Sequence, residues 1–357
     1  MTTYGVALIG CGNIAGAYAR DLKNYPEIEL LGVTDMDPER ARVFGEEHAT
    51  HVYPDVDSLL ADPRVQIAVN LTSHFAHKEI SERALQAGKH VYSEKPMATT
   101  SEGAHELVAL AKARGLRLSC SPFTLLGEAQ QTAWKLIRDG KLGTVRVAYA
   151  EVNWGRIESW HPAPGPFYEV GALFDVGVYP LTILTALFGP VKRVVSYGKV
   201  LHADRVTKEG VPFHINTPDF AVSMLETASG TVVRLTTDFY VSNQTSRQTG
   251  IEFHGDLGSL FLESWHNFTC KVQYAEFGQP LEDVPLLRQP SHDRVPWGRG
   301  VHELVMALLE DRPQRFSGEQ AAHVTDILTA AARSMVDNQP VELTSTFAPP
   351  SPLEWAE

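Results

Sequence analysis

The stretch Val6-Ala-Leu-Ile-Gly10-Cys-Gly12-Asn-Ile-Ala15 decides the fold of this chain. Its first residues form an apolar run typical of a buried strand, and its end opens a segment in which Ile14, Tyr18 and Leu22 recur at helical spacing. Between strand and helix stands a G-x-G-x-x-A pattern. In that pattern the first glycine makes a tight turn, the second lets the backbone approach a pyrophosphate, and the small third residue lets the helix pack on the strand. The stretch therefore predicts the first β-turn-α unit of a dinucleotide-binding sheet.

The same alternation of strand and helix continues through the first 120 residues. Short apolar runs are separated by amphipathic helical segments, which implies a parallel sheet covered on both faces. After Pro122 strand patterns dominate, and residues 251–254 alternate between apolar and polar, which is typical of an antiparallel sheet with one wetter face. The expected strands are residues 6–9, 30–34, 65–71, 90–93 and 116–120, and then 145–152, 191–200, 220–226, 231–240, 250–254, 259–263 and 271–277.

We predict an α/β protein with two domains and a tail. Residues 1–120 form a doubly wound parallel sheet of the Rossmann type, and residues 121–345 form an α/β domain for substrate binding and oligomerisation. Residues 346–357 are rich in proline and are expected to be loose. A chain of 357 residues is long enough to bury two such cores.

Asp35 stands at the end of the second expected strand, 20 residues after Ala15. A carboxylate at this place accepts hydrogen bonds from the ribose hydroxyls of adenosine and repels a 2′-phosphate. No arginine directly follows it, so NAD is favoured over NADP as the cofactor. The helix N-terminus after the glycine loop supplies free N–H groups to the phosphates. The cofactor site predicted from these patterns comprises Gly10, Gly12, Asn13, Ile14 and Asp35.

Composition and charge argue against several classes of partner. Lys plus Arg number 31 and Asp plus Glu number 43, so the net charge of −12 repels nucleic acids and anionic membranes. The three cysteines, Cys11, Cys120 and Cys270, are odd in number and widely spaced, as expected for reduced thiols. No basic and apolar leader precedes the first strand, and the apolar run 177–189 is too short to span a bilayer. We therefore expect a cytoplasmic protein with no nucleic-acid or membrane partner.

The stretch His90-Val-Tyr-Ser-Glu-Lys-Pro-Met97 places an acid, a base and a proline at the end of another expected strand. In an open parallel sheet, ligands bind beyond the carboxyl ends of the strands. Lys95 is therefore expected to face the nicotinamide side of the crevice, with Pro96 setting the direction of the chain. Exposed lysines at strand ends are common, so Lys95 indicates a functional site only in combination with the other motifs.

Together these motifs resemble the glucose-fructose oxidoreductase, inositol dehydrogenase and rhizopine-catabolism (Gfo/Idh/MocA) family. The resemblance covers nearly the whole chain in order and rests on Gly10-x-Gly12-x-x-Ala15, Asn70-Leu-Thr72 with His77, Ala87-Gly-Lys-His-Val91 before Glu94-Lys95-Pro96, and Gly171-Ala-Leu-Phe-Asp175-Val-Gly177-Val-Tyr179. It implies a Rossmann domain followed by an α/β domain with an open, mostly antiparallel sheet. It implies hydride transfer between a nicotinamide and a carbon of a sugar or polyol. It also implies that Thr72, His77, Glu94 and Lys95 belong to the cofactor site.

By the same resemblance, Lys95 matches the family's catalytic lysine, and Asp175 and Tyr179 match its second catalytic pair. Many inositol-dehydrogenase-like members have histidine where this chain has Tyr179, which weakens inositol as a substrate. The spacing of these residues supports the same role, because Asp175 and Tyr179 are four positions apart and therefore share a helix face. A free phenol has a pKa of about 10, and a nearby lysine stabilises both its phenolate and a developing alkoxide. We predict Tyr179 as the acid/base and Lys95 as its electrostatic partner, and leave open that the lysine itself carries the proton.

A loop rich in glycine and proline precedes Asp175 and carries Arg156, Trp160 and His161. Aromatic faces, a guanidinium and an imidazole suit a polyhydroxylated ligand, so these three residues are candidate substrate contacts. A metal site is not expected, because His74 and His77 have no third ligand at a recognisable spacing.

The sequence predicts an NAD(P)-dependent dehydrogenase or reductase acting on the CH–OH group of a sugar, polyol or sugar derivative. Two alternatives with the same fold stay open, an NAD-dependent glycosidase and a non-catalytic NAD-bound sensor. The intact set of Lys95, Asp175 and Tyr179 argues against the sensor. A sheet with one face in need of cover also predicts a homodimer or homotetramer.

Overall fold

The computed structural model describes residues 2–244, 249–290 and 295–357. The chain divides into two compact units. Unit 1 comprises Met1–Phe123 and Pro296–Thr325, and unit 2 comprises Thr124–Val295 and Asp326–Glu357. Each unit is therefore built from two separate stretches of the sequence.

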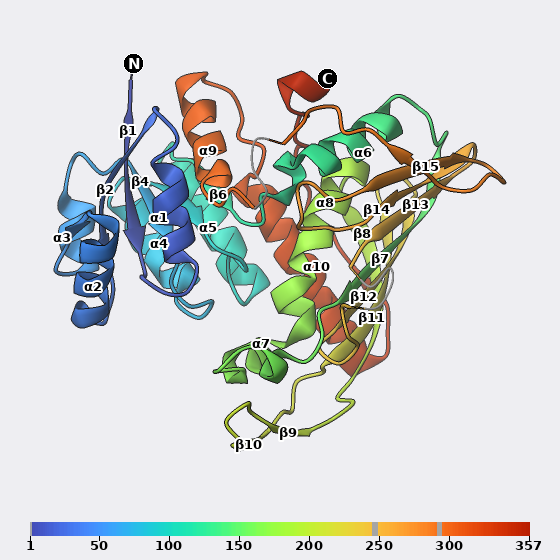
Figure 1. Cartoon of the computed structure of the whole chain (residues 1–357), viewed down its shortest axis with the longest axis horizontal. Helices are drawn as coiled ribbons and strands as arrows, with labels where there is room; N and C mark the ends of the chain where they lie inside the picture. The colour runs from blue at the N-terminus through green and yellow to red at the C-terminus, as the bar shows by residue number, and fades with distance from the viewer. Residues whose placement is uncertain (1, 245–248, 291–294) are drawn as a thin grey trace. The chain divides into compact units, whose positions relative to one another are not determined.

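Unit 1 is a six-stranded parallel sheet flanked by helices (Figure 1). The strand order is β3-β2-β1-β4-β5-β6, and the neighbouring strands are paired in parallel. The chain winds outward from β1 in both directions, so the topological switch point, where doubly wound sheets bind ligands, lies between β1 and β4. This sheet confirms the predicted Rossmann-type fold. Its elements are β1 (Tyr4–Ile9), α1 (Ala15–Leu22), β2 (Ile28–Thr34), α2 (Pro38–His48), β3 (His51–Val52), α3 (Val56–Ala61), β4 (Ile67–Asn70), α4 (His77–Gln86), β5 (His90–Ser93), α5 (Ser101–Ala113), β6 (Leu118–Cys120) and α9 (Arg299–Leu309).

The segment Pro296–Thr325 belongs to unit 1 although it lies far along the chain. The N–H of Gly298 donates to Asp21 Oδ2 at 3.2 Å, and the ring of His302 stacks on Tyr25 with 4.2 Å between centroids. The expected domain of residues 121–345 included this segment, and the structure differs there. The reason is that packing between segments distant in sequence produces no local sequence pattern from which it can be predicted.

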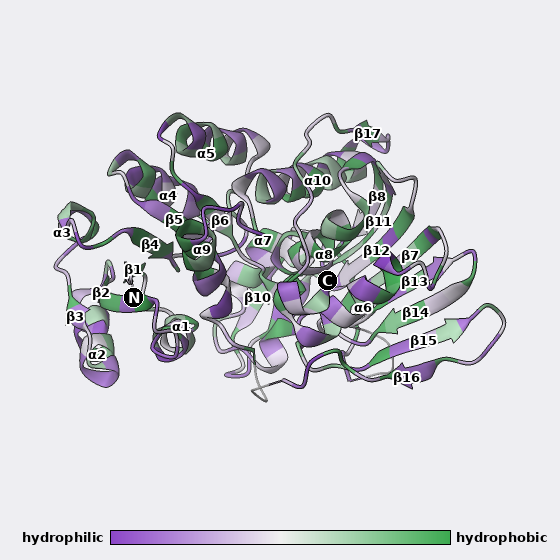
Figure 2. Ribbon diagram, turned by 90° about the horizontal axis from the view of Figure 1, so that it is seen from above, coloured by the Kyte–Doolittle hydropathy of each residue, from purple (hydrophilic) through white to green (hydrophobic). Residues whose placement is uncertain are grey.

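Unit 2 is built on a nine-stranded mixed sheet of order β16-β15-β14-β13-β7-β12-β11-β8-β17. The pair β7–β12 is parallel and the other neighbouring pairs are antiparallel, which confirms the expected mostly antiparallel sheet. Figure 2 shows these strands side by side, with α6, α8 and the later part of α10 on one face. Its strands are β7 (Val145–Asn153), β8 (Val191–Lys199), β11 (Phe220–Thr227), β12 (Val232–Asp238), β13 (Ile251–Gly255), β14 (Gly258–Leu262), β15 (Val272–Glu276), β16 (Glu282–Val284) and β17 (Val341–Glu342), and a separate hairpin pairs β9 (Asp204–Val206) with β10 (Pro212–His214). Its helices are α6 (Glu128–Arg138), α7 (Gly165–Val176), α8 (Val178–Phe188), α10 (Gly318–Asp337, which begins in unit 1) and the short turns η1 (Thr124–Leu126), η2 (Ile157–Ser159) and η3 (Glu354–Ala356).

One helical run in unit 2 is long and apolar enough to cross a membrane. Within the described residues, Gly165–Phe188 spans 24 residues and contains a window of mean hydropathy 1.7. However, 72% of that window is buried inside the protein, and a buried core helix has the same composition. The expectation that the chain has no membrane partner stays a prediction.

The proline-rich C-terminal segment packs on unit 2. The N–H of Leu353 donates to Gln131 Oε1 at 3.0 Å, Arg138 donates to the carbonyl of Ala356, and Ala356 is fully buried. The sequence analysis expected a loose tail. The structure instead holds it on α6 through side-chain donors and acceptors that a proline-rich composition does not reveal.

Candidate active site

The loop after β1 has two glycines that are required for different reasons. Gly10 has φ +102°, and a Cβ on it would lie 2.8 Å from the carbonyl oxygen of Leu71, so only glycine is tolerated. A Cβ on Gly12 would have no described atom within 4 Å, so packing within the chain does not explain this glycine. Close approach of a bound group to the backbone would explain it. Ala15, the first residue of α1, is fully buried. With Asn13 and Ile14 leading into α1, the loop fits the pyrophosphate of a dinucleotide.

Asp35, directly after β2, is aimed at the same loop. Its Oδ2 accepts the N–H of Cys11 at 2.7 Å, and its Oδ1 accepts the N–H of Asp37 at 2.9 Å. An ionised carboxylate has about four acceptor positions, so lone pairs remain for the hydroxyls of a ribose. The guanidinium of Arg40, on α2, lies 3.5 Å from Asp35 Oδ1. The sequence pattern did not indicate Arg40, because only an arginine directly after Asp35 is expected to bind a 2′-phosphate.

Glu94 and Lys95 follow β5, and the carboxylate of Glu94 is held by the protein itself. Tyr18 and Ser121 donate their hydroxyls to its Oε1 at 2.7 and 3.0 Å, and the N–H of Lys95 donates to its Oε2 at 3.1 Å. Burial and the charge of Glu94 raise the pKa of Tyr18 well above its usual value, so this tyrosine stays a donor. Glu94 thus holds the backbone from which Lys95 projects, and the Lys95–Pro96 peptide bond is cis.

His77 connects the loop after β4 with the turn after β5. Its Nδ1 lies 2.7 Å from the carbonyl oxygen of Pro96, and its Nε2 lies 3.0 Å from that of Thr72. Burial lowers the pKa of His77, and a neutral imidazole has only one N–H to give to the two carbonyls. The hydroxyl of Thr72 donates to Asn70 Oδ1 at 2.7 Å. Both predicted cofactor residues therefore lie at the carboxyl edge of the sheet, where His77 contacts the backbone of Thr72 and Pro96 and the Thr72 hydroxyl is bound to the side chain of Asn70.

Asp175 and Tyr179 lie in unit 2, on a helix that bends before it reaches them. Gly171 leaves the helical conformation with φ +80° and ψ 158°. Beyond it, the N–H of Gly177 donates to Leu173 at 3.0 Å, and the carbonyl of Gly177 accepts from Leu181 at 3.2 Å. The helical backbone therefore continues from Leu173 across Gly177 into α8, so the half-buried side chains of Asp175 and Tyr179 share one face.

Tyr179 belongs to an aromatic cluster at the end of β7. Its ring centroid lies 4.8 Å from that of Trp265, which is buried and donates its indole N–H to the carbonyl of Glu151 at 3.2 Å. Trp154 and His266 lie 5.4 and 4.5 Å from Trp265. Burial lowers the pKa of His266 to about 4, so at neutral pH this imidazole is uncharged. Sequence reasoning missed Trp265 and His266, since nothing in the loop between β14 and β15 signals a site.

The predicted substrate residues Arg156, Trp160 and His161 lie on the loop that follows β7. The rings of Trp160 and His161 are 5.4 Å apart and both contact Phe167, at 6.0 and 4.8 Å. The guanidinium of Arg156 lies over the ring of Tyr240 at 4.4 Å. Unit 2 therefore contains Asp175, Tyr179 and this loop, whereas Lys95 and the predicted nucleotide residues are in unit 1.

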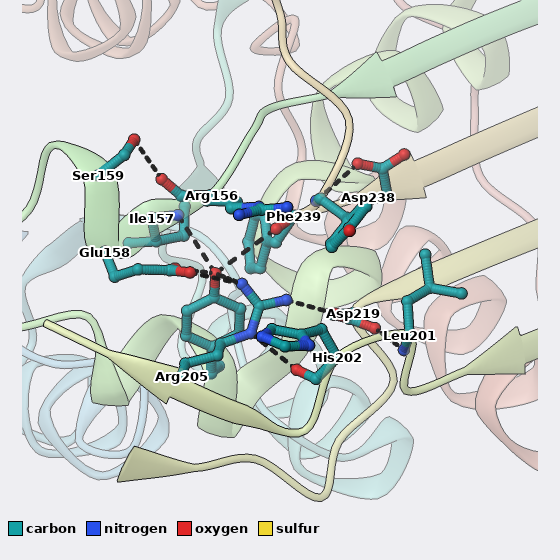
Figure 3. A network of polar contacts seen from close by, with 12 residues as sticks. Arg156, Ile157, Glu158, Ser159, Leu201, His202, Arg205, Asp219, Asp238 and Phe239 are labelled. Carbon is teal, nitrogen blue, oxygen red and sulfur yellow. Dashed lines mark hydrogen bonds and ion pairs between the residues drawn. The ribbon is translucent and has the colours of Figure 1, made fainter. Parts of the chain in front are cut away.

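A buried arginine anchors that loop (Figure 3). The guanidinium of Arg205, on β9, donates to Glu158 Oε1 at 2.7 Å and to Asp219 Oδ2 at 2.5 Å, and both Arg205 and Asp219 have fully buried side chains. Arg205 also donates at 2.7 Å to the hydroxyl of Tyr168, which accepts the N–H of Ile157 and donates to Glu158. No pattern in the sequence indicated this network, because its members come from four separate segments.

Within the described residues, no group of three or more His, Cys, Asp or Glu side chains is arranged to hold a metal ion. His77 is one of the two histidines considered as metal ligands in the sequence. Both of its ring nitrogens face backbone carbonyls instead.

Two family models match the chain. Residues 4–121 match an oxidoreductase family with an NAD-binding Rossmann fold, and residues 130–261 match a GFO/IDH/MocA C-terminal domain. The trans-1,2-dihydrobenzene-1,2-diol dehydrogenase of Macaca fuscata fuscata is 31% identical, over 52% of this chain and 56% of that enzyme. The dTDP-3,4-didehydro-2,6-dideoxy-alpha-D-glucose 3-reductase of Streptomyces antibioticus is 30% identical, over 64% of this chain and 74% of that enzyme. In fold, the chain is similar to levoglucosan dehydrogenase in complex with NADH and L-sorbose, with a TM-score of 0.85, 19% identity and coverage of 97% and 100%.

Proposed function

Because the chain belongs to the Gfo/Idh/MocA oxidoreductase family, we propose that it is an NAD-dependent dehydrogenase or reductase acting on a CH–OH group of a sugar, polyol or sugar derivative. The observation that carries the proposal is the fit of the Gly10–Gly12 loop and Asp35 to a dinucleotide. The names of relatives support the substrate class, since one reduces a deoxysugar nucleotide and another is a levoglucosan dehydrogenase.

When bound, the nicotinamide accepts or supplies the hydride. Tyr179 then takes the hydroxyl proton of the substrate, or returns it in the reverse direction. In this proposal the ammonium of Lys95 stabilises negative charge that develops on the substrate oxygen, and Asp175, on the same helix face as Tyr179, orients the phenol. Trp265 stacks on Tyr179 and limits the positions that its ring can adopt.

The direct test is a panel of sugars and polyols added to purified protein with NAD, with the absorbance of NADH as readout. We expect net reduction of NAD by at least one sugar or polyol. Tight binding of NAD without reduction by any member of the panel would contradict the proposed activity and support a sensor.

The preference for NAD over NADP gives a second test. Replacing Asp35 by serine removes the acceptor proposed for the adenosine ribose, so the Kd for NAD should rise by about ten- to a hundredfold. The Kd for NADP should fall or stay the same, because the charge opposing the 2′-phosphate is gone while Arg40 remains. Titration by calorimetry measures both constants.

The matched control for that experiment is Asp37→Ser. Asp37 is the exposed neighbouring carboxylate that caps α2, and serine retains the ability to cap. Equal losses of NAD affinity in Asp35→Ser and Asp37→Ser would contradict the role proposed for Asp35.

We also propose that unit 2 pairs with a second copy of this chain through the outer face of its sheet. Val195, Tyr197 and Met224 point to that face and are 42%, 58% and 43% exposed, and Val195 and Met224 are cross-strand partners. Replacing Met224 by lysine should shift a dimer or tetramer toward monomer, as measured by light scattering. Val211→Lys, at an exposed position near β10, is the control, and a monomeric parent protein would remove the proposal.

A cytoplasmic location is the remaining proposal. Cys11, Cys120 and Cys270 are all free and buried, which suits a reducing compartment. Fractionation of cells that express the chain tests it.

A further inference from the structure

Two arginines near the predicted substrate loop have opposite environments. Arg205 is fully buried, and its guanidinium is engaged by Glu158, Asp219 and the hydroxyl of Tyr168 (Figure 3). Arg156 is exposed and stands two residues before Glu158. It is the only lysine or arginine between Arg146 and Lys192.

The guanidinium of Arg156 is held in place by an aromatic ring. It lies 4.4 Å above the ring of Tyr240, and the turn that carries Tyr240 is fixed by Asp238. The Oδ1 of Asp238, a fully buried residue, accepts the N–H of Tyr240 at 2.8 Å and that of Val241 at 2.7 Å. The position of the charge is therefore set by a hydrogen-bonded turn and by stacking, and no hydrogen bond to a described residue takes the hydrogen-bonding edge of the guanidinium.

Carboxylates of the described chain that lie near this loop are engaged elsewhere. Glu158 is bound by Arg205 and Tyr168, and Glu151 accepts from Arg234 at 2.6 Å. The Oδ1 of Asp238 accepts from two backbone amides, and its Oδ2 is buried. Among the described residues, Arg156 makes no hydrogen bond or ion pair through its guanidinium, and its contact with Tyr240 is of the cation–π type.

Arg156 also lies close in sequence to the aromatic cluster around Tyr179. Trp154, two residues earlier, lies 5.4 Å from Trp265, and Trp265 lies 4.8 Å from Tyr179. Arg156 thus presents a guanidinium that no described carboxylate neutralises, in the segment after β7 that also contributes Trp154 to the surroundings of the proposed acid/base.

We infer that the substrate carries a carboxylate or phosphate group and that Arg156 recognises it. This inference rests on the proposed function and names its substrate class, a sugar acid or sugar phosphate instead of a neutral sugar. A guanidinium is planar and matches two oxygens of a carboxylate or phosphate with two parallel N–H bonds. The neutral parent sugar offers no such partner.

The test uses protein loaded with NADH and two matched sets of probes. These are D-glucose, D-glucuronate and D-glucose 6-phosphate, and D-galactose, D-galacturonate and D-galactose 6-phosphate. Binding is followed by intrinsic tryptophan fluorescence, and turnover with NAD is followed by the absorbance of NADH. The two anions distinguish carboxylate from phosphate as the recognised group.

The parent protein should bind one of the anions about ten- to a hundredfold more tightly than the neutral sugar of its set. Arg156→Gln should lose this discrimination, with a higher KM and little change in kcat for any anion that is turned over. Arg156→Lys should retain part of it, because the charge remains while the planar fork is lost. Arg146→Gln, which removes an exposed arginine at the other end of β7, should retain it fully.

Equal affinity for neutral and anionic probes, or discrimination that survives in Arg156→Gln, would overturn the inference. Equal rates of NAD reduction by a neutral sugar and by its acid would also overturn the inference. That result would still support the proposed dehydrogenase activity. If NADH binds but no probe of either set binds or is turned over, the proposed sugar substrate fails together with the inference.

Discussion

Tyr179→Phe should lower kcat by about 10²–10⁴-fold, because proton transfer by a positioned side chain contributes that much to such reactions. Phenylalanine keeps the ring that packs 4.8 Å from Trp265, so the aromatic cluster and the fold should be retained. The Kd for NAD should be unchanged, since the predicted nucleotide residues belong to unit 1. Steady-state turnover of the first sugar found to reduce NAD, together with calorimetry of NAD binding, measures both effects.

Tyr274→Phe is the matched control, because it removes a phenol hydroxyl on β15 that donates to the carbonyl of Lys141. It should leave kcat unchanged.

Lys95→Met distinguishes Tyr179 from Lys95 as the group that carries the proton, an alternative that the sequence leaves open. If Tyr179 is the acid/base and Lys95 its electrostatic partner, as proposed, loss of the lysine should move the pKa of the pH–rate profile upward, since a phenolate is harder to form without a cation to stabilise it. A Tyr179→Phe protein that turns over like its parent, with a large loss in Lys95→Met, would assign the proton to the lysine instead.

Arg205→Met should lower the free energy of unfolding by about 3–5 kcal/mol, because removal of one partner leaves buried carboxylates uncompensated. Asp219 has a fully buried side chain, and that of Glu158 is 11% exposed, so water cannot replace the guanidinium at Asp219. Denaturant unfolding measures the loss. Hydrogen exchange should also rise in residues 154–161, since this loop is bound to Arg205 directly through Glu158 and indirectly through Ile157, whose N–H donates to the Tyr168 hydroxyl that Arg205 also contacts.

Two comparisons make this prediction specific. Arg146→Met removes an arginine that pairs with Asp256 on the surface, where both partners are about half exposed or more, and should change stability little. The double variant Arg205→Met with Asp219→Asn should recover part of the loss, because one of the stranded charges is gone. Equal stability of Arg205→Met and Arg146→Met would show that the buried network does not anchor the loop.

The nucleotide-binding part of the candidate site was largely predictable. Strand, glycine loop and helix follow one another within residues 6–22, and Asp35 ends the next strand, so local pattern and the rules of parallel sheets place them together. Arg40 was missed although it is near in sequence, because its approach to Asp35 depends on how α2 starts. The shared face of Asp175 and Tyr179 followed from helical spacing, but the bend at Gly171 did not.

By itself the sequence determined the two kinds of sheet, the glycine loop, Asp35, the strand end at Lys95 and the spacing of Asp175 and Tyr179. These are short-range features, set by hydrophobic period, turn chemistry and the direction of neighbouring strands. Only the tertiary structure decided that Pro296–Thr325 returns to unit 1, that Trp265 lies against Tyr179, and that Arg205 gathers Glu158, Tyr168 and Asp219. Those contacts join segments tens to hundreds of residues apart, and their energy comes from burial and charge pairing that no local stretch of sequence contains.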